Sequence, residues 1–332
     1  MKATAKYLCN SDPVKYYLVG TLAALSLQAS ALDFSPDTTR IISDPAYLPT
    51  AGQVYGTTAY TFSGKYTGDV NNFAGVKKYS FDTQQRAITQ SLAYGINDNL
   101  TVRLSDTYIP SSKTDFNNVA GPATETRSSG LSDPTIGFTY RIVDQKSSPV
   151  NFDVIGSYSP DIIDAKSSTT SHDGTVARGG QQGSLGVATS YETRSFTVLG
   201  SVGTNYLGSR DVRNPNTDFT TSVDSSWDYF AGVQTQTRIT DQFSINAGVT
   251  YTTSNHADAS NPNVAYTIKN GNVTDLNLSL NYAVIPNRLV AQLIYNRDLY
   301  DNSHNQFTVA TADTTTTDHV GDVYTAKLLY VF

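Results

Sequence analysis

The sequence predicts an all-β fold, a transmembrane antiparallel up-and-down β-barrel of about 12 strands. Two observations predict it. Twelve segments of the chain alternate apolar and polar residues with a period of two, as strands do when one face meets lipid and the other a polar lumen. Short and long polar connections also alternate between these segments, as hairpins do at the two ends of a barrel.

The carboxy-terminal segment shows the alternation most clearly. One face carries the apolar or aromatic side chains of Tyr324, Ala326, Leu328, Tyr330 and Phe332. A strand that ends on an aromatic residue resembles the closing strand of bacterial outer-membrane barrels. The resemblance implies that the chain lies in the bacterial cell outer membrane and that the barrel-insertion machinery binds it through Phe332.

The amino-terminal residues predict export. Three lysines precede an apolar run from Leu18 to Leu27, and Ala29, Ser30 and Ala31 form a small-residue cleavage site. The run is too short to cross a bilayer as a helix, which needs about 20 residues. We therefore expect residues 1–31 to be a signal peptide and residues 51–332 to be the barrel. Residues 32–50 lack a period and would form either a periplasmic tail or a plug in the lumen.

The composition excludes several classes of protein. The formal net charge is −6 and no basic patch occurs, so no nucleic-acid partner is expected. The single cysteine, Cys9, lies within the predicted signal peptide, which suits an exported chain that avoids stray disulfides. Tyrosine (22) and phenylalanine (13) far outnumber tryptophan and methionine (one each), which favours strands over helices.

Most strands can be placed from the alternation. The apolar positions of the clearest strands, apart from the closing one, fall within Leu100–Leu104, Ile136–Ile142, Phe152–Tyr158, Leu185–Tyr191, Phe196–Val202, Trp227–Val233, Phe243–Val249, Leu276–Tyr282 and Leu289–Tyr295. Two polar residues, Gln90 and Asp106, fall on the lipid-facing phase, and a bulge would correct either one.

The connections predict the topology. The short ones fall at 97–99, 144–149, 192–194, 239–242 and 285–288, and the long ones at about 64–78, 109–130, 159–183, 207–225, 253–272 and 298–320. Short periplasmic turns and long surface loops are typical of outer-membrane barrels. We expect both termini on the periplasmic side and the long loops beside lipid and lipopolysaccharide at the cell surface.

Outward aromatic residues support a membrane barrel over a soluble β-sandwich. Five ascending strands begin with leucine or phenylalanine and reach their last outward tyrosine six to ten residues later. Eight residues climb about 21 Å at a tilt of about 40°, close to an apolar band of about 25 Å. Sandwich strands would instead direct leucine, valine and isoleucine into a shared core.

The inward phase predicts the residues that line the lumen. Its charged members, together with one aromatic residue, are Arg103, Arg141, Asp153, Asp228, Phe230, Arg238, Asp275 and Lys327. The charges either pair with one another across a filled lumen or line a pore that orients polar solutes. Arg141, at the periplasmic end of its strand, is expected to meet water.

Further apolar residues share the inward phase. They are Ile155, Leu199, Val290, Ile294 and Leu329. They either pack the interior or form an apolar track for a hydrophobic solute, in which Phe230 would be the first contact.

No catalytic or cofactor motif stands out. All four histidines fall in predicted long loops, and no serine–histidine pair lies on the predicted wall. No histidine or cysteine spacing typical of a metal site occurs, and nothing resembles a nucleotide site. We therefore expect no enzyme, no catalytic residue and no cofactor. The remaining enzymatic alternative is a hydrolase at the extracellular rim that uses His319 and loop acids.

Two stretches resemble a known family. Ala93–Leu100 (AYGINDNL) and Gly130–Ile142 (GLSDPTIGFTYRI) are similar to a strand–turn–strand motif and to a Gly-x-x-Asp-Pro strand entry of the outer-membrane transporters associated with the MetA pathway of phenol degradation. Pro134 suits the start of a strand, where a missing N–H is tolerated. The resemblance implies a barrel that helps small, often hydrophobic compounds cross the outer membrane.

The sequence therefore favours an outer-membrane channel or facilitator for passive passage of a small solute, hydrophobic and aromatic compounds among the candidates. The rival hypothesis is a structural or adhesive barrel with a filled lumen and long loops that bind a surface.

Overall fold

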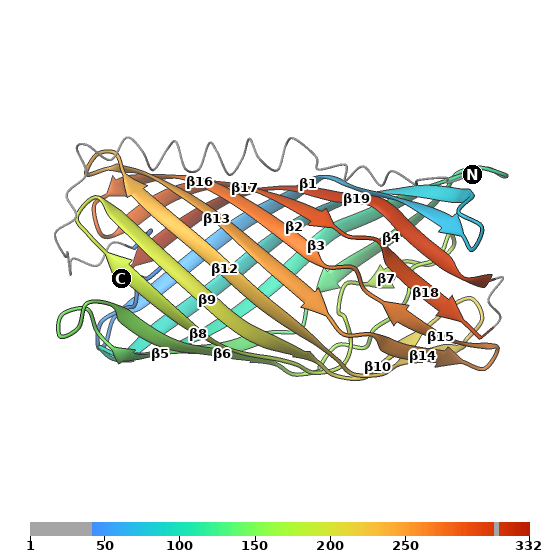
Figure 1. The fold of residues 1–332 in the computed structure, drawn as a ribbon, viewed down its shortest axis with the longest axis horizontal. Coiled ribbons are helices and arrows are strands. Elements are labelled where there is room, and N and C mark those ends of the chain that lie inside the picture. The colour runs from blue at the N-terminus through green and yellow to red at the C-terminus, as the bar shows by residue number, and fades with distance from the viewer. Residues whose placement is uncertain (1–41, 309–311) are drawn as a thin grey trace, which may run out of the picture.

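The computed structural model describes residues 42–308 and 312–332. The predicted signal peptide and residues 32–41 lie outside this part. The fold is a closed antiparallel barrel of twelve strands, as the sequence predicts (Figure 1). The wall strands are β1 (Val54–Asn72), β2 (Lys77–Asn97), β3 (Leu100–Asn118), β5 (Thr135–Val143), β6 (Asn151–Ser159), β8 (Gln182–Glu192), β9 (Phe196–Leu207), β12 (Ser226–Arg238), β13 (Phe243–Ser254), β16 (Val273–Ile285), β17 (Leu289–Tyr300) and β19 (Thr314–Val331).

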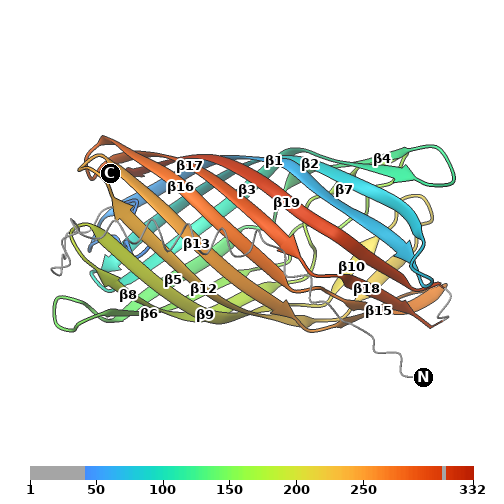
Figure 2. The same ribbon diagram turned by 45° about the horizontal axis from the view of Figure 1, so that its top comes forward.

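Short strands extend the sheet at one end. They are β4 (Thr124–Leu131), β7 (Gly174–Thr175), β10 (Arg210–Arg213), β11 (Thr220–Val223), β14 (Ala257–Asn261), β15 (Val264–Lys269) and β18 (Ser303–Phe307). We call this the loop end. The opposite turn end has the five short connections and the carboxy-terminus (Figure 2). No helix in the described residues is long and apolar enough to cross a membrane.

Pairing of the first and last strands closes the barrel. β1 and β19 run antiparallel from the pair Tyr55–Val331 to the pair Asn72–Thr314, with two bulges between. The backbone N–H of Phe332 adds a hydrogen bond of 3.0 Å to the Val54 carbonyl. Closure leaves no sheet edge, so the wall satisfies its backbone polar groups internally, as a hydrocarbon environment requires.

The outer surface is apolar, as the alternation predicts. Leu293 is 62 % exposed and Leu104 is 54 % exposed, and outward tyrosines such as Tyr94 and Tyr108 lie on either side of such residues. In a water-soluble protein such large apolar side chains would be buried. The closed barrel and its apolar outer surface place the chain in the bacterial outer membrane.

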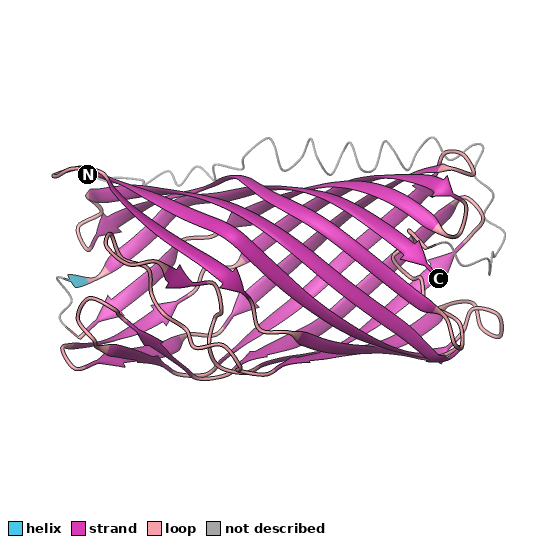
Figure 3. Cartoon of the chain, turned by 180° about the vertical axis from the view of Figure 1, so that it is seen from behind, coloured by secondary structure: helices cyan, strands magenta, loops and turns pink. Residues whose placement is uncertain are grey.

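The predicted long loops at 64–78 and 109–130 are largely strand, which corrects the sequence analysis. β1 has 19 residues and would rise about 50 Å at a tilt of about 40°, twice the apolar band of about 25 Å. Beyond that band both faces of the wall meet water, so the strands lose their apolar alternation while backbone pairing continues. In the view from behind, long strands rather than loops make up most of the length of the wall (Figure 3).

No bulge turns the polar residues Gln90 and Asp106 away from the outer face of the barrel. Gln90 lies directly across from Asp106 in the β2–β3 ladder, whose register is regular at this point. The Thr58 hydroxyl on β1 donates a hydrogen bond of 2.8 Å to the Gln90 Oε1. The three side chains thus form a polar row on the outer face.

We predict that Gly56 is required at the closing seam. A methyl group on Gly56 would collide with the ring of Tyr330, which covers it from β19. Gly56→Ala should lower the free energy of unfolding by about 1–3 kcal/mol because the ring must leave its rotamer. Urea unfolding in lipid vesicles measures the change. Gly200→Ala is the control, since nothing lies within 4 Å of its methyl position, and an equal loss in both variants would contradict the seam argument.

Candidate functional site: the lumen and its turn end

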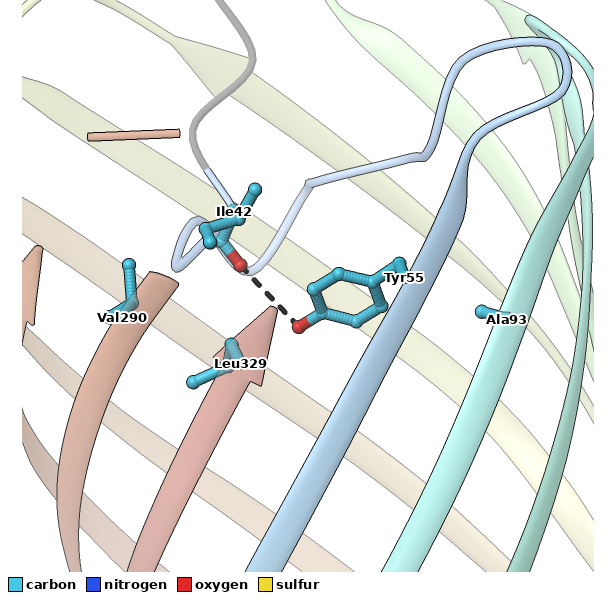
Figure 4. Packing of buried hydrophobic residues seen from close by; sticks show 5 residues of the cluster. All are labelled: Ile42, Tyr55, Ala93, Val290 and Leu329. Carbon is cyan, nitrogen blue, oxygen red and sulfur yellow. Dashed lines mark hydrogen bonds between the residues drawn. The ribbon is translucent and has the colours of Figure 1, made fainter. Parts of the chain in front are cut away.

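Residues 42–50 lie inside the turn end of the barrel. Ile42 packs among Tyr55, Val290 and Leu329, which come from strands β1, β17 and β19 (Figure 4). The Tyr55 hydroxyl donates a hydrogen bond of 3.5 Å to the Ile42 carbonyl. On another side of the lumen, Ala46 packs against Ala188 and Leu199 of β8 and β9. The segment therefore contacts the wall on several sides.

Polar contacts hold the same segment. The fully buried Gln236 of β12 donates from Nε2 to the Ser43 carbonyl and hydroxyl at 3.1 and 3.2 Å. Asn246 of β13 donates to the same carbonyl at 3.4 Å. These amides satisfy backbone groups that would otherwise be unpaired inside the barrel. Alternation alone places Gln236 inward, but only the structure shows that it binds residues near the amino-terminus.

Asp44 anchors the segment electrostatically. Its Oδ2 accepts a hydrogen bond of 2.5 Å from the Thr197 hydroxyl and lies 3.4 Å from Nη2 of Arg238. Burial raises the pKa of the Asp44 carboxyl, while Thr197 and Arg238 favour its ionised form. The predicted lumenal Arg238 therefore faces the lumen and has a carboxylate partner from outside the wall.

Arg141 and Asp153 form a buried ion pair across strands β5 and β6. Nε and Nη2 of Arg141 lie 2.8 and 3.0 Å from the two carboxylate oxygens. Nη2 also donates a hydrogen bond of 2.8 Å to the Ala46 carbonyl. The expectation that Arg141 meets water is wrong: the side chain is 2 % exposed because residues 42–48 cover it.

Arg103 and Lys327 differ from Arg141 and Arg238 in their surroundings. Both project into the lumen, and Arg103 is exposed there. Within residues 42–308 and 312–332, neither has a carboxylate within ion-pair distance, and the two positive charges act on each other. Among the described residues, Arg141 and Arg238 at the turn end thus have carboxylate partners, whereas Arg103 and Lys327 further in have none.

The predicted inward apolar residues divide into two groups. Leu199, Val290 and Leu329 are buried against residues 42–46, so they pack the turn end. Ile155 is 38 % exposed to the lumen.

Phe230 lies along the wall rather than across the lumen. Gly203 of β9 is its neighbour in the ladder, and Gly186 of β8 is the next residue in the same row. A methyl group on either glycine would approach the tip of the Phe230 ring, most severely on Gly203. The two glycines thus make the surface on which the ring rests.

The two remaining predicted acids lie toward the loop end. Asp228 of β12 lines a pocket with Arg178, a residue that the sequence analysis did not single out. Asp275 of β16 is paired in register with Asp298 of β17. The predicted inward charges therefore do not form one cluster; the barrel distributes them along its length.

His319 is not a loop residue, contrary to expectation. It lies in β19, and its ring stacks on Tyr300 with centroids 3.8 Å apart. Tyr66 and Phe81 contact the same ring edge-on at 4.7 and 5.4 Å. His319 thus belongs to an aromatic cluster near the loop end. No group of three potential metal ligands occurs in the described part of the chain.

Comparison with known proteins supports the fold. No family model matches the chain, and no curated protein matches it. Among solved structures, it is similar to an outer membrane channel from Pseudomonas putida F1, with 14 % identity, a TM-score of 0.59 and coverage of 87 % of this chain and 99 % of that one. It is also similar to the transport unit of the autotransporter AIDA-I from Escherichia coli, with 10 % identity, a TM-score of 0.54 and coverage of 94 % and 98 %. These likenesses establish the fold of an outer-membrane barrel.

We predict that the Arg141–Asp153 pair is structural. Asp153→Ala leaves the Arg141 charge buried without its partner, so the free energy of unfolding should fall by about 3–5 kcal/mol. Asp69→Ala removes a comparable but exposed pair with Lys77 and should cost about 0–1 kcal/mol. Urea unfolding of both variants checks this, and equal losses would contradict the burial argument.

Proposed function

We propose that this chain is a passive outer-membrane channel for small solutes. The observation that carries the proposal is the pair Arg103 and Lys327, two cations that face the lumen without an acidic partner in the described residues. An unpaired charge in a packed, dry interior would be strongly destabilising. Water in this part of the lumen stabilises both cations and provides a path for solute.

The likeness to the Pseudomonas putida F1 outer membrane channel supports the same function. The resemblance to transporters of the MetA pathway adds the expectation of small hydrophobic or aromatic compounds. Ile155, Phe230 and the half-buried Ile294 are the predicted apolar side chains available to such a solute, since Leu199, Val290 and Leu329 are covered by residues 42–46. The charged lumen favours solutes that also carry a polar or anionic group.

Residues 42–48 would set the rate of passage. They occupy the turn end, which we assign to the periplasmic side as the pattern of turns predicts. They are held by side-chain hydrogen bonds, one ion pair and apolar contacts rather than by strand pairing, so local undocking can open the path without unfolding the wall. The concentration gradient would drive transport.

A second candidate is a structural barrel with a filled lumen, favoured by the same segment. In that case the long strands at the loop end would bind lipopolysaccharide or a surface. Recognition of Phe332 by the insertion machinery is compatible with either function; its ring is 79 % exposed.

We predict that residues 42–48 restrict conductance. Their replacement by glycine and serine preserves the chain length and removes the apolar side chains of Ile42 and Ala46 and the Asp44 carboxylate that binds Thr197 and Arg238. Single-channel conductance of the refolded protein in a planar bilayer should increase several-fold. The same replacement of residues 119–123, an exposed hairpin tip, is the control. A variant that remains silent after replacement of residues 42–48 would favour the filled structural barrel.

We predict that the unpaired cations set ion selectivity. Arg103→Gln together with Lys327→Gln should shift the reversal potential in a salt gradient toward cation selectivity, because the lumen loses two positive charges that have no acidic partner in the described residues. Lys146→Gln, in an exposed turn, should leave the potential unchanged. An unaltered potential in the double variant would remove these residues from the conducting path.

A further inference from the structure

A second lumenal feature lies toward the loop end. It is a pocket of about 500 Å³ lined by Asp133, Asp228 and Arg178 and by several hydroxyl groups. Part of its floor is a row of inward residues on successive strands, in which Ser157, Ser184, Asn205 and Asp228 are neighbours in register. The Ser157 and Ser184 hydroxyls are 2.7 Å apart. The pocket is therefore polar and built from the wall itself.

The opposite side of the pocket is the β6–β8 connection, residues 160–181. Nη1 of Arg178 donates to the Gly208 carbonyl at 3.1 Å, and Nη1 of Arg210 donates to the Arg178 carbonyl at 3.3 Å. Gly180 has φ of +72°, a conformation that favours glycine, and a methyl group there would collide with the Ser209 carbonyl. These constraints fix the connection against the corner between β9 and β10.

Two carboxylates that line this pocket each have one oxygen without a hydrogen-bond donor in the described residues. Asp133 is only 7 % exposed; its Oδ1 accepts hydrogen bonds of 2.9 Å from the backbone of Ile162 and Ile163, while its Oδ2 has no donor among the described residues. Asp228 Oδ1 is likewise buried without a donor in that part of the chain. Buried polar atoms are normally hydrogen-bonded, so each of these enclosed oxygens lacks a donor that such an atom ordinarily has.

The cations of the pocket do not occupy these oxygens. Burial and the nearby Arg210 lower the pKa of the Arg178 guanidinium to about 10, while the charge of Asp228 opposes that change. Arg178 directs Nη1 to the carbonyls of Gly179 and Gly208. Arg178 therefore does not neutralise either carboxylate, and the loop side of the pocket remains positively charged.

We propose that this pocket binds the protonated amine of a small solute, with Asp133 and Asp228 as the acceptors. The ammonium group provides three donors, which matches two acceptor oxygens and a hydroxyl of the wall. The positive Arg178 adds a position for a carboxylate when the solute is zwitterionic. As a step in transport, the inference rests on the proposed channel function, and it names one class of solute that the channel would take.

Isothermal titration of the refolded chain in detergent micelles tests the pocket without requiring conduction. The probes are n-butylammonium, 4-aminobutyrate and butyrate. We expect both amines to bind and butyrate not to bind. Asp133→Asn with Asp228→Asn should weaken amine binding at least about tenfold, because charge-assisted hydrogen bonds are lost. Tighter binding of 4-aminobutyrate than of n-butylammonium would assign the zwitterion as the preferred solute, and the reverse order a simple amine.

The asparagine variants retain the shape of the side chain and, at Asp133, the Oδ1 acceptor for the loop. Asp173→Asn, an exposed acid on the same connection, is the matched control and should bind like the wild type. Binding of butyrate alone, or equal amine affinity in the wild type and the double variant, would overturn the proposal. Amine binding by a barrel that shows no conductance would support the pocket and overturn the proposed channel. Conductance without amine binding would support the channel and overturn the proposed pocket.

Discussion

The pairing of β1 with β19 is the constraint on which the rest of the structure depends. In hydrocarbon every backbone polar group needs an internal partner, so a sheet can cross the membrane only when its first and last strands meet. Closure then fixes the face of every residue, because side chains alternate along each strand. Leucines and tyrosines that would be buried elsewhere point outward, and the polar set is enclosed. The closed wall with its apolar exterior thus directs the charged side chains into the lumen.

The polar side chains enclosed in the lumen still differ in the partners that they find, and two groups can be distinguished. At the turn end, residues 42–48 bring carbonyls and the Asp44 carboxylate to Arg141, Arg238 and Gln236. Further in, Arg103 and Lys327 have no comparable partner in the described chain. The contrast within one lumen separates structural charges from those available to a solute.

The sequence predicts the strands and the faces of the wall because a period of two depends only on local residues. It could not predict that β1 and β3 continue beyond the membrane, since water on both faces removes the alternation there. It also could not show that Arg141 is buried, because the residues that cover it are 95 positions away. Because the alternation is lost beyond the membrane, the sequence also predicted His319 to lie in a loop, although it lies in the long strand β19. Asp133 lay within a recognisable Gly-x-x-Asp-Pro motif, yet its role depends on Arg178 and Asp228 from distant segments.

The distribution of lumenal charge has a physical consequence for selectivity. Asp133 and Asp228 present acceptors toward the loop end, whereas Arg103 and Lys327, elsewhere in the lumen, present positive charge without acidic partners among residues 42–308 and 312–332. A lumen of one sign would attract one class of ion and repel the other along its whole length. In the proposed channel, separate acceptor and donor regions would instead favour solutes that carry both kinds of group. Selectivity of this kind arises from the order of the charges along the path, and the net charge of the chain does not reveal it.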